Sequence, residues 1–178
     1  MTRILLTATF LFLAVLGVQR PEPAAGQDAG KEPKESEWKR LPVIAKTPWY
    51  YGGLDRGTPP RQVVLRSAGE LLSAIGYRTV TPAALQASGE IARLLGVDEI
   101  DWKQNMVVTV TGGVKPTGGY TCTLEYIKVH PDPKQMRAVA VWSHTSPDGA
   151  APIGITNPGS LALVERFDGK IEFIEMKK

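Results

Sequence analysis

Residues 106–129 read MVVTVTGGVKPTGGYTCTLEYIKV, which is two β-patterned runs joined by a glycine-rich loop. The first run, 106–111, is almost entirely β-branched, and the second, 120–129, alternates apolar and polar residues as a half-buried strand does. In the loop, a proline fixes its own φ near about −65°, and two glycines permit positive φ. We therefore predict that the chain reverses tightly here and displays the segment 115–120 with its main-chain N–H groups.

Strand spacing continues towards the C-terminal end, and no helical pattern follows residue 100. The runs at 161–166 and 170–175 are joined by Phe167-Asp168-Gly169, which is a hairpin signal. An isolated β-branched run also lies upstream, at 62–66. After residue 100 the sequence predicts five consecutive antiparallel strands, at 106–111, 120–129, 137–142, 161–166 and 170–175.

Two short helices are predicted before this strand region. Ser67 with Glu70 three residues later matches a capping box, which starts the first helix. Thr81 precedes a proline, the arrangement favoured at the start of a second helix, and Gly96 matches a glycine at its end. The apolar residues on one face of this second helix are Ala84, Ala87, Ile91, Leu94 and Leu95. We expect the two helices to lie across an apolar surface.

Helices and strands that are segregated along a chain indicate the α+β class. We predict a single α+β domain over 41–178, with short helices followed by an antiparallel β-sheet that forms a meander or a sandwich. Such a length is enough for one domain with a real core. The sequence contains one cysteine, Cys122, so no internal disulfide can form.

The first 26 residues have the pattern of a signal peptide. Arg3 supplies positive charge, 4–18 is an almost unbroken apolar run, and small residues at 24–26 offer a cleavage site. We predict export to the periplasm or the cell exterior, with no stable membrane span after cleavage; retention of the segment as an anchor is the alternative. Residues 27–40 are rich in charge and predict a disordered linker.

Charge identifies no class of partner. The formal net charge is +3, and the basic residues are scattered, with no stripe and no interleaved aromatic residues. A nucleic-acid-binding surface needs such a concentration of positive charge. We therefore expect no nucleic-acid partner, and another exported protein instead.

The residues that carry catalysis are sparse in this sequence. His130 and His144 each stand alone, and Ser143 is adjacent to His144, so that in a strand their side chains point to opposite faces. Cys122 lies in a strand pattern, where a cysteine usually acts as a small buried apolar residue and not as a thiol nucleophile. The acidic residues of 98–101 are spaced too closely for a calcium loop, and no spacing suggests zinc. We predict no enzyme activity, no cofactor and no metal site.

The candidate partner-binding residues are Lys115, Pro116, Thr117, Gly118, Gly119 and Tyr120. Two interpretations of this segment remain open. It is a structural turn, in which the tyrosine ring enters the core, or it is a contact surface, since binding residues favour loops on a rigid scaffold. A second aromatic cluster, Trp49-Tyr50-Tyr51, covers a sheet edge or forms a hot spot for protein contact.

Three segments together resemble the PrcB C-terminal domain family. They are Ile100-Asp101-Trp102-Lys103, then 106–110, then Gly113-Val114-Lys115-Pro116-Thr117-Gly118-Gly119-Tyr120, and Asn157-Pro158 followed by 161–164 matches a later return of that family to its last apolar strand. The resemblance covers 62–176. Members are exported bacterial proteins, and the family takes its name from a subunit that is thought to assist the assembly of a secreted protease complex. It implies a non-catalytic, protein-binding accessory subunit whose partner is an exported protease.

A weaker resemblance links the same segment to chagasin-type inhibitors of papain-like cysteine proteases. Those proteins insert an Asn-Pro-Thr-Thr-Gly-Tyr loop into a protease cleft; here Lys115 replaces the asparagine and Gly118 replaces the second threonine. Residues 149–154 resemble their second binding loop, which is rich in glycine and proline. This resemblance implies the alternative function of a protease inhibitor.

Overall fold

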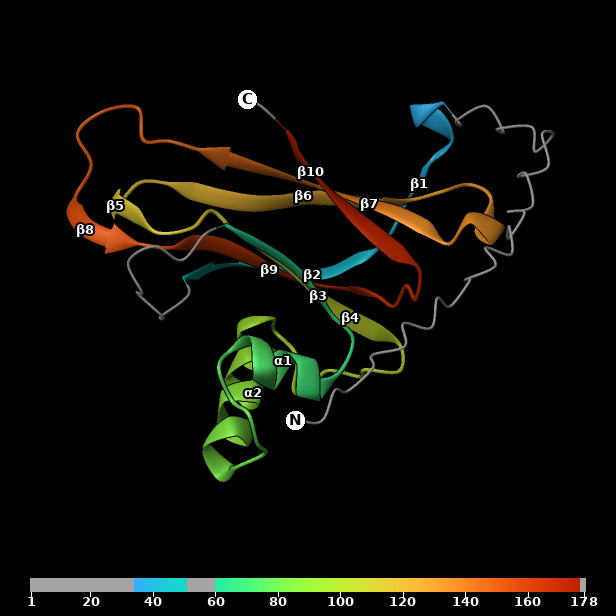
Figure 1. Ribbon diagram of the computed structural model, residues 1–178, viewed down its shortest axis with the longest axis horizontal. Helices are drawn as coiled ribbons and strands as arrows, with labels where there is room; N and C mark the ends of the chain where they lie inside the picture. Colours follow the sequence, from blue (N-terminus) through green and yellow to red (C-terminus); the bar gives the residue numbers. More distant parts are fainter. Residues whose placement is uncertain (1–33, 51–59, 177–178) are drawn as a thin grey trace, which may run out of the picture. The chain divides into compact units, whose positions relative to one another are not determined.

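Two four-stranded β-sheets face each other across a shared apolar core, and two helices cover the outer face of one sheet (Figure 1). The computed structural model describes residues 34–50 and 60–176. The predictions for the signal peptide 1–26, for 27–33 of the linker and for the side chains of Trp49-Tyr50-Tyr51 fall outside what the structure describes. In the described part, helices and strands form one α+β unit, which confirms the predicted class.

Sheet A has the strand order β1-β6-β7-β10. Its strands are β1 (Lys39–Arg40), β6 (Thr121–Val129), β7 (Arg137–Thr145) and β10 (Lys170–Met176). β6 runs antiparallel to β1 and to β7, whereas β10 runs parallel to β7, with Phe173 opposite Ala140. Sheet A is therefore mixed, and the prediction of five strands that are all antiparallel is wrong at the last one.

Sheet B has the strand order β2-β9-β4-β3, and its neighbouring strands are all antiparallel. Its strands are β2 (Val43–Tyr50), β9 (Pro158–Glu165), β4 (Asn105–Thr111) and β3 (Arg61–Leu65). Because β2 and β4 occupy both edges of β9, the chain after β9 cannot fold back beside it. It crosses to sheet A and adds β10 there, so the hairpin predicted at 167–169 is wrong.

The sequence patterns also miss β2, which carries Pro48. Proline has no N–H to donate to a ladder and is tolerated at the edge of a sheet, where one side of the strand makes no ladder bonds. β2 is such an edge strand, paired only with β9 among the described strands. Two strands of sheet B, β2 and β3, thus precede the helices.

The core between the sheets takes alternate residues from the two central strands of each sheet. Sheet B contributes Met106, Val108, Val110, Ala162 and Val164, and sheet A contributes Cys122, Leu124, Ile127, Ala138, Ala140 and Trp142. In β6 the alternation predicted for 120–129 shifts by one residue after Leu124, because a β-bulge lies between Leu124 and Tyr126. Ile127 is therefore the buried residue there.

A second core lies between the outer face of sheet B and the helices. The helices that cover this face are α1 (Ala68–Ala74) and α2 (Pro82–Leu94). Two short 3-10 helices, η1 (Glu35–Glu37) and η2 (Pro133–Gln135), lie elsewhere in the chain. Leu65, Val107 and Leu163 form its floor, and the residues that cover them include Leu71, Ile91 and Leu95. The prediction that the helices cross an apolar surface is confirmed.

Both predicted helix starts are confirmed. The Ser67 hydroxyl accepts a hydrogen bond from the Glu70 N–H at 3.2 Å, and the Thr81 hydroxyl accepts one from the Ala84 N–H at 3.2 Å. Gly96 follows α2 with φ at 72°, as a terminating glycine requires. The predicted buried face is wrong at Leu94, which is 52% exposed, because the helix turns Ala92 towards the sheet instead. Among the helices described, none has both the length and the apolar character needed to cross a bilayer.

The end of the predicted linker is ordered against sheet A. The Lys128 ammonium contacts the Glu35 carboxylate at 2.7 Å, and Trp38 packs edge-on against the His130 ring with centroids 5.2 Å apart. Lys39 then pairs opposite Val129 in β1. The boundary predicted at residue 40 is therefore wrong, since a tryptophan and a short strand fix this part of the chain to β6 and the residues after it.

Two arginines hold the crossing from sheet B to sheet A. The Arg66 guanidinium donates to the carbonyl oxygens of Phe167 at 3.1 Å and Gly169 at 2.8 Å. The Arg166 guanidinium donates to the carbonyl oxygens of Arg66 at 3.2 Å and Trp102 at 2.5 Å. We call these two side chains the arginine pair. They tie the β9–β10 connection to the junction between β3 and α1.

Candidate functional site

The segment predicted as a hairpin loop connects the two sheets. β4 belongs to sheet B and β6 to sheet A, so the residues between them pass from one sheet to the other. On the way they form a short strand, β5 (Lys115–Thr117), which pairs antiparallel with β8 (Ile153–Thr156) in a separate two-stranded ribbon (Figure 1). The prediction that the chain simply reverses between two paired strands is therefore wrong.

We call residues 115–119 and 152–154 the ribbon tip. Of the predicted binding residues, Pro116 and Gly119 are exposed, and Lys115, Thr117, Gly118 and Tyr120 are half-buried. The Gly118 N–H donates to the Pro152 carbonyl oxygen at 2.9 Å, and the Thr156 hydroxyl donates to the Thr117 carbonyl oxygen at 2.9 Å. The Gly118 N–H is thus occupied within the ribbon, and the expectation that it is free for a partner is wrong.

The two glycines of the ribbon tip have different roles. Gly119 has φ at 79°, and a Cβ atom there would lie 2.9 Å from the Cβ of Pro147. Gly118 has no positive φ, and a Cβ atom there would meet Pro152 at an ordinary 3.6 Å. Glycine is therefore required at 119 for conformation and for space, whereas at 118 it is not.

The most exposed large apolar side chain of the ribbon tip is Ile153. It is 99% exposed and lies opposite Thr117 in the register of β5 with β8. The ribbon thereby brings the 115–119 segment and the 152–154 segment side by side, although they are more than 30 residues apart in the sequence. Sequence reasoning named the first segment as a binding site but did not identify Ile153.

Next to the ribbon, polar and ionisable side chains cluster around Tyr120. The Tyr120 ring stacks on the His144 ring with centroids 5.9 Å apart, and the Lys115 ammonium lies 5.5 Å from the centre of the Tyr120 ring. His144 lies opposite Cys122 in the register of β6 with β7. Tyr120 therefore packs at the margin of the core and not inside it.

The electrostatics of this cluster do not activate the thiol. Burial, reinforced by the Glu175 carboxylate, raises the pKa of Cys122 to about 12, so this cysteine is protonated at neutral pH. Burial and the nearby Lys115 ammonium lower the pKa of His144. Cys122 therefore lacks the thiolate that a nucleophile or a metal ligand needs.

The neighbouring serine is engaged elsewhere. The Ser143 hydroxyl is buried and donates to the Glu125 carboxylate at 2.5 Å, and Ser143 lies opposite Thr123 while His144 lies opposite Cys122. These adjacent side chains point to opposite faces of β7, as strand geometry requires. Within the described residues, no three His, Cys, Asp or Glu side chains gather where they could hold a metal ion.

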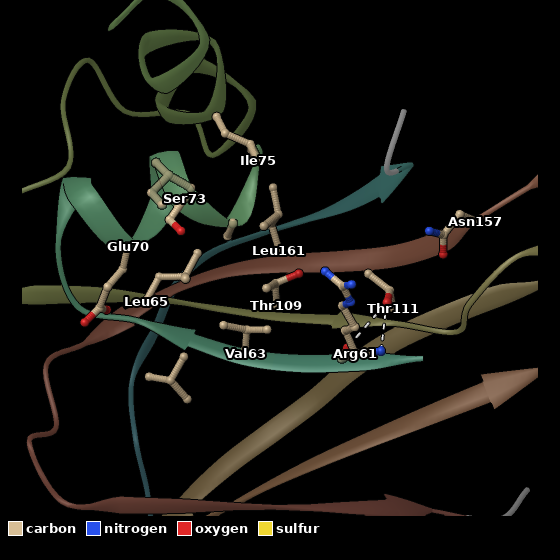
Figure 2. A pocket seen from close by; sticks show the side chains of 13 residues that line it. Arg61, Val63, Leu65, Glu70, Ser73, Ile75, Thr109, Thr111, Asn157 and Leu161 are labelled. Carbon is tan, nitrogen blue, oxygen red and sulfur yellow. Dashed lines mark hydrogen bonds between the residues drawn. The ribbon is translucent and has the colours of Figure 1, made fainter. Parts of the chain in front are cut away.

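A cavity of about 400 Å³ lies between α1 and the outer face of sheet B (Figure 2). Its apolar wall includes Val63, Leu71, Ala74, Ile75 and Leu161, and its polar wall contains Arg61, Thr109, Thr111 and Asn157. Sequence reasoning missed this cavity. The available signal was the pair of threonines in β4, at 109 and 111, which place hydroxyl groups in an otherwise apolar strand.

No family model, curated protein or solved structure matches this chain. The resemblances to the PrcB C-terminal domain family and to chagasin-type inhibitors therefore stay predictions made on the quoted residues.

Proposed function

We propose that this chain is an exported, non-catalytic domain that binds another exported protein through its ribbon tip. The partner class that we propose is an extracytoplasmic protease or one of its subunits, with this chain as an accessory or assembly component. Export rests on the pattern of residues 1–26, and the partner class rests on the resemblance of the 113–120 segment to the PrcB C-terminal domain family.

The observation that carries the proposal is the nearly complete exposure of Ile153 on an ordered ribbon. Fully burying an isoleucine side chain contributes about 1.5–3 kcal/mol, so a partner that covers Ile153 gains substantially at one position. Pro116 and Pro152 are also exposed beside it, and the two prolines limit the conformational freedom that binding would have to remove.

The ribbon is held in place by contacts at several points. Main-chain hydrogen bonds join β5 to β8, and the side chain of Thr156 adds a bond to the Thr117 carbonyl oxygen. At its base, Lys115, Tyr120 and His144 pack against one another. A preorganised surface of this kind favours recognition because little ordering is left to occur on binding.

One observation favours the alternative, a chagasin-like inhibitor of papain-type cysteine proteases. That function needs two loops presented together, and the ribbon pairs the 115–117 segment directly with the segment that begins at Ile153. The two functions differ in their outcome: an inhibitor blocks a purified protease, whereas an accessory subunit binds its partner without occupying the active-site cleft.

Site-specific crosslinking tests the proposal. A photoreactive amino acid at position 153 should capture a defined partner in the exported fraction of the native host, and the same group at Leu85, which is 60% exposed on α2, should not. Ile153→Asp should weaken binding of the captured partner by about tenfold or more, and Leu85→Asp should leave it unchanged. Equal capture from both positions would refute the ribbon tip as the binding site.

Enzyme assays separate the two candidate functions. The purified chain should leave papain-like proteases active at micromolar concentration if it is an accessory subunit. Inhibition that is lost in Ile153→Asp would instead establish the alternative, with the same ribbon tip as the inhibitory element.

A further inference from the structure

The cavity under α1 lies where the polarity of one sheet face changes. Residues that face the helices form successive cross-strand rows on β3, β4 and β9, set by the register. The first row is Leu65, Val107 and Leu163, the second is Val63, Thr109 and Leu161, and the third is Arg61, Thr111 and Gly159. The helices cover the first row, and the cavity opens over the second and third.

Two buried polar atoms that line this cavity have no hydrogen-bond partner among residues 34–50 and 60–176. Thr109 is 5% exposed and Asn157 is 2% exposed, yet the Thr109 hydroxyl oxygen and the Asn157 Oδ1 make no hydrogen bond within these ranges. Both residues line the cavity. A buried polar atom without a partner costs about 1–3 kcal/mol, so such atoms in a cavity indicate groups that a ligand can satisfy.

The positive and negative side chains that line the cavity lie apart from each other. Arg61 lies beside Thr109 and Thr111, and Glu70 lies apart from them on α1, as Figure 2 shows. The Glu70 carboxylate already accepts a hydrogen bond from the Arg66 N–H at 2.5 Å, whereas no carboxylate in the described residues pairs with the Arg61 guanidinium. The part of the cavity near Arg61 therefore suits a carboxylate, and a guanidinium can bind one through two parallel hydrogen bonds.

We propose that this cavity binds a short apolar peptide segment that ends in a free carboxylate. The carboxylate contacts the Arg61 guanidinium and accepts from the Thr109 hydroxyl. A peptide N–H donates to the Asn157 Oδ1. Apolar side chains of the segment fill the space beside Val63, Ile75 and Leu161.

The requirement for a donor argues for a peptide over a fatty acid. A fatty acid offers a carboxylate and an apolar chain, which satisfy Arg61 and the apolar wall, but it has no N–H for the Asn157 Oδ1. A volume of about 400 Å³ also lies in the range of sites for small ligands. The site is separate from the ribbon tip, since the two share no lining residue.

Calorimetry with three probes tests this inference. N-acetyl-leucyl-leucine with a free carboxylate should bind the full chain, and its C-terminal amide should bind about tenfold more weakly or worse, because the charged pair with Arg61 is lost. Octanoate, which lacks the N–H, should also bind more weakly. Absence of binding by the free acid at millimolar concentration, or equal affinity for acid and amide, would overturn the proposal, and octanoate binding as tightly as the free acid would overturn its peptide part.

Two variants locate the binding. Arg61→Gln should weaken binding of the free acid by about tenfold and leave the affinity for the amide unchanged. Thr109→Val removes an unpartnered buried hydroxyl, so it should weaken peptide binding without lowering the melting temperature, which separates lost binding from lost folding. If both variants bind the free acid as the native chain does, the peptide occupies another site and the proposal fails. Ile153→Asp, which alters the ribbon tip, should bind the free acid with unchanged affinity.

Discussion

At the scale of single residues, Gly119 and Gly118 should respond differently when a side chain is added. Gly119→Ala places a side chain at positive φ and against Pro147, so the free energy of unfolding should fall by about 1–3 kcal/mol. Gly118→Ala meets only ordinary contacts, and its free energy of unfolding should change by less than about 0.5 kcal/mol. Urea unfolding of both variants measures the difference, and equal losses would contradict the assigned roles.

His144 gives the fold a pH dependence of defined sign. Its folded pKa is lowered, so the unfolded chain takes up a proton first as the pH falls below about 6.5, and stability is lost in that direction. Free energies of unfolding measured between neutral and mildly acidic pH should show this loss, and His144→Gln should reduce it. An unchanged pH slope in the variant would mean that other groups dominate.

Neighbouring charges should move the His144 pKa in opposite directions. The Lys115 ammonium lowers it and the Glu175 carboxylate raises it, so Lys115→Ala should give a higher pKa than the native chain and Glu175→Gln a lower one. NMR titration of the imidazole measures both shifts. Shifts of the same sign in the two variants would exclude this arrangement of charges.

Sequence reasoning at this scale identified the residues that act locally. The Ser67 and Thr81 caps and the terminating Gly96 depend on groups within a few positions, and all three were predicted. Ile153 was missed, because nothing near it in the sequence shows that β8 pairs with β5 and leaves its side chain exposed. The cavity was missed for a similar reason, since Arg61, Thr109 and Asn157 meet only after the sheet has formed.

At the scale of elements, the arginine pair holds the path by which the chain changes sheets. Arg166→Lys keeps the charge but cannot reproduce both main-chain hydrogen bonds, so the free energy of unfolding should fall by about 1–3 kcal/mol. Arg93→Lys, on the exposed surface of α2, is the matched control and should change stability by less than about 0.5 kcal/mol. Thermal and urea unfolding measure both, and a neutral Arg166→Lys would show that the pair is dispensable.

The positions of the strands were predicted better than the way in which the strands pair. Apolar and β-branched runs located β4 and β9, which are buried on both faces, and strand-type patterns also located β6, β7 and β10. Pairing leaves no such local mark: β10 could not be recognised as parallel to β7 without knowing that β9 has no free edge. The bulge in β6 likewise shifts the buried row without any glycine or proline to indicate it.

At the scale of the whole molecule, β10 completes the shared core from the far end of the chain. Ile171 and Phe173 pack against the core, and β10 pairs with β7 along its full length. A chain that stops after Asp168 should lose cooperative unfolding and its near-ultraviolet circular dichroism, because one side of β7 and the adjacent core are then exposed. A chain that stops after Met176 is the control and should unfold as the full chain does.

The insertion of β9 between β2 and β4 has a consequence for the order of events during synthesis. β2 is complete at residue 50, but its partner in sheet B is not made until residues 158–165 have been added, with Trp49 opposite Gly159. At cellular elongation rates of about 5–20 residues per second, β2 waits on the order of ten seconds for the strand that secures it. β2 and β4 therefore cannot join into one sheet before β9 has been synthesised.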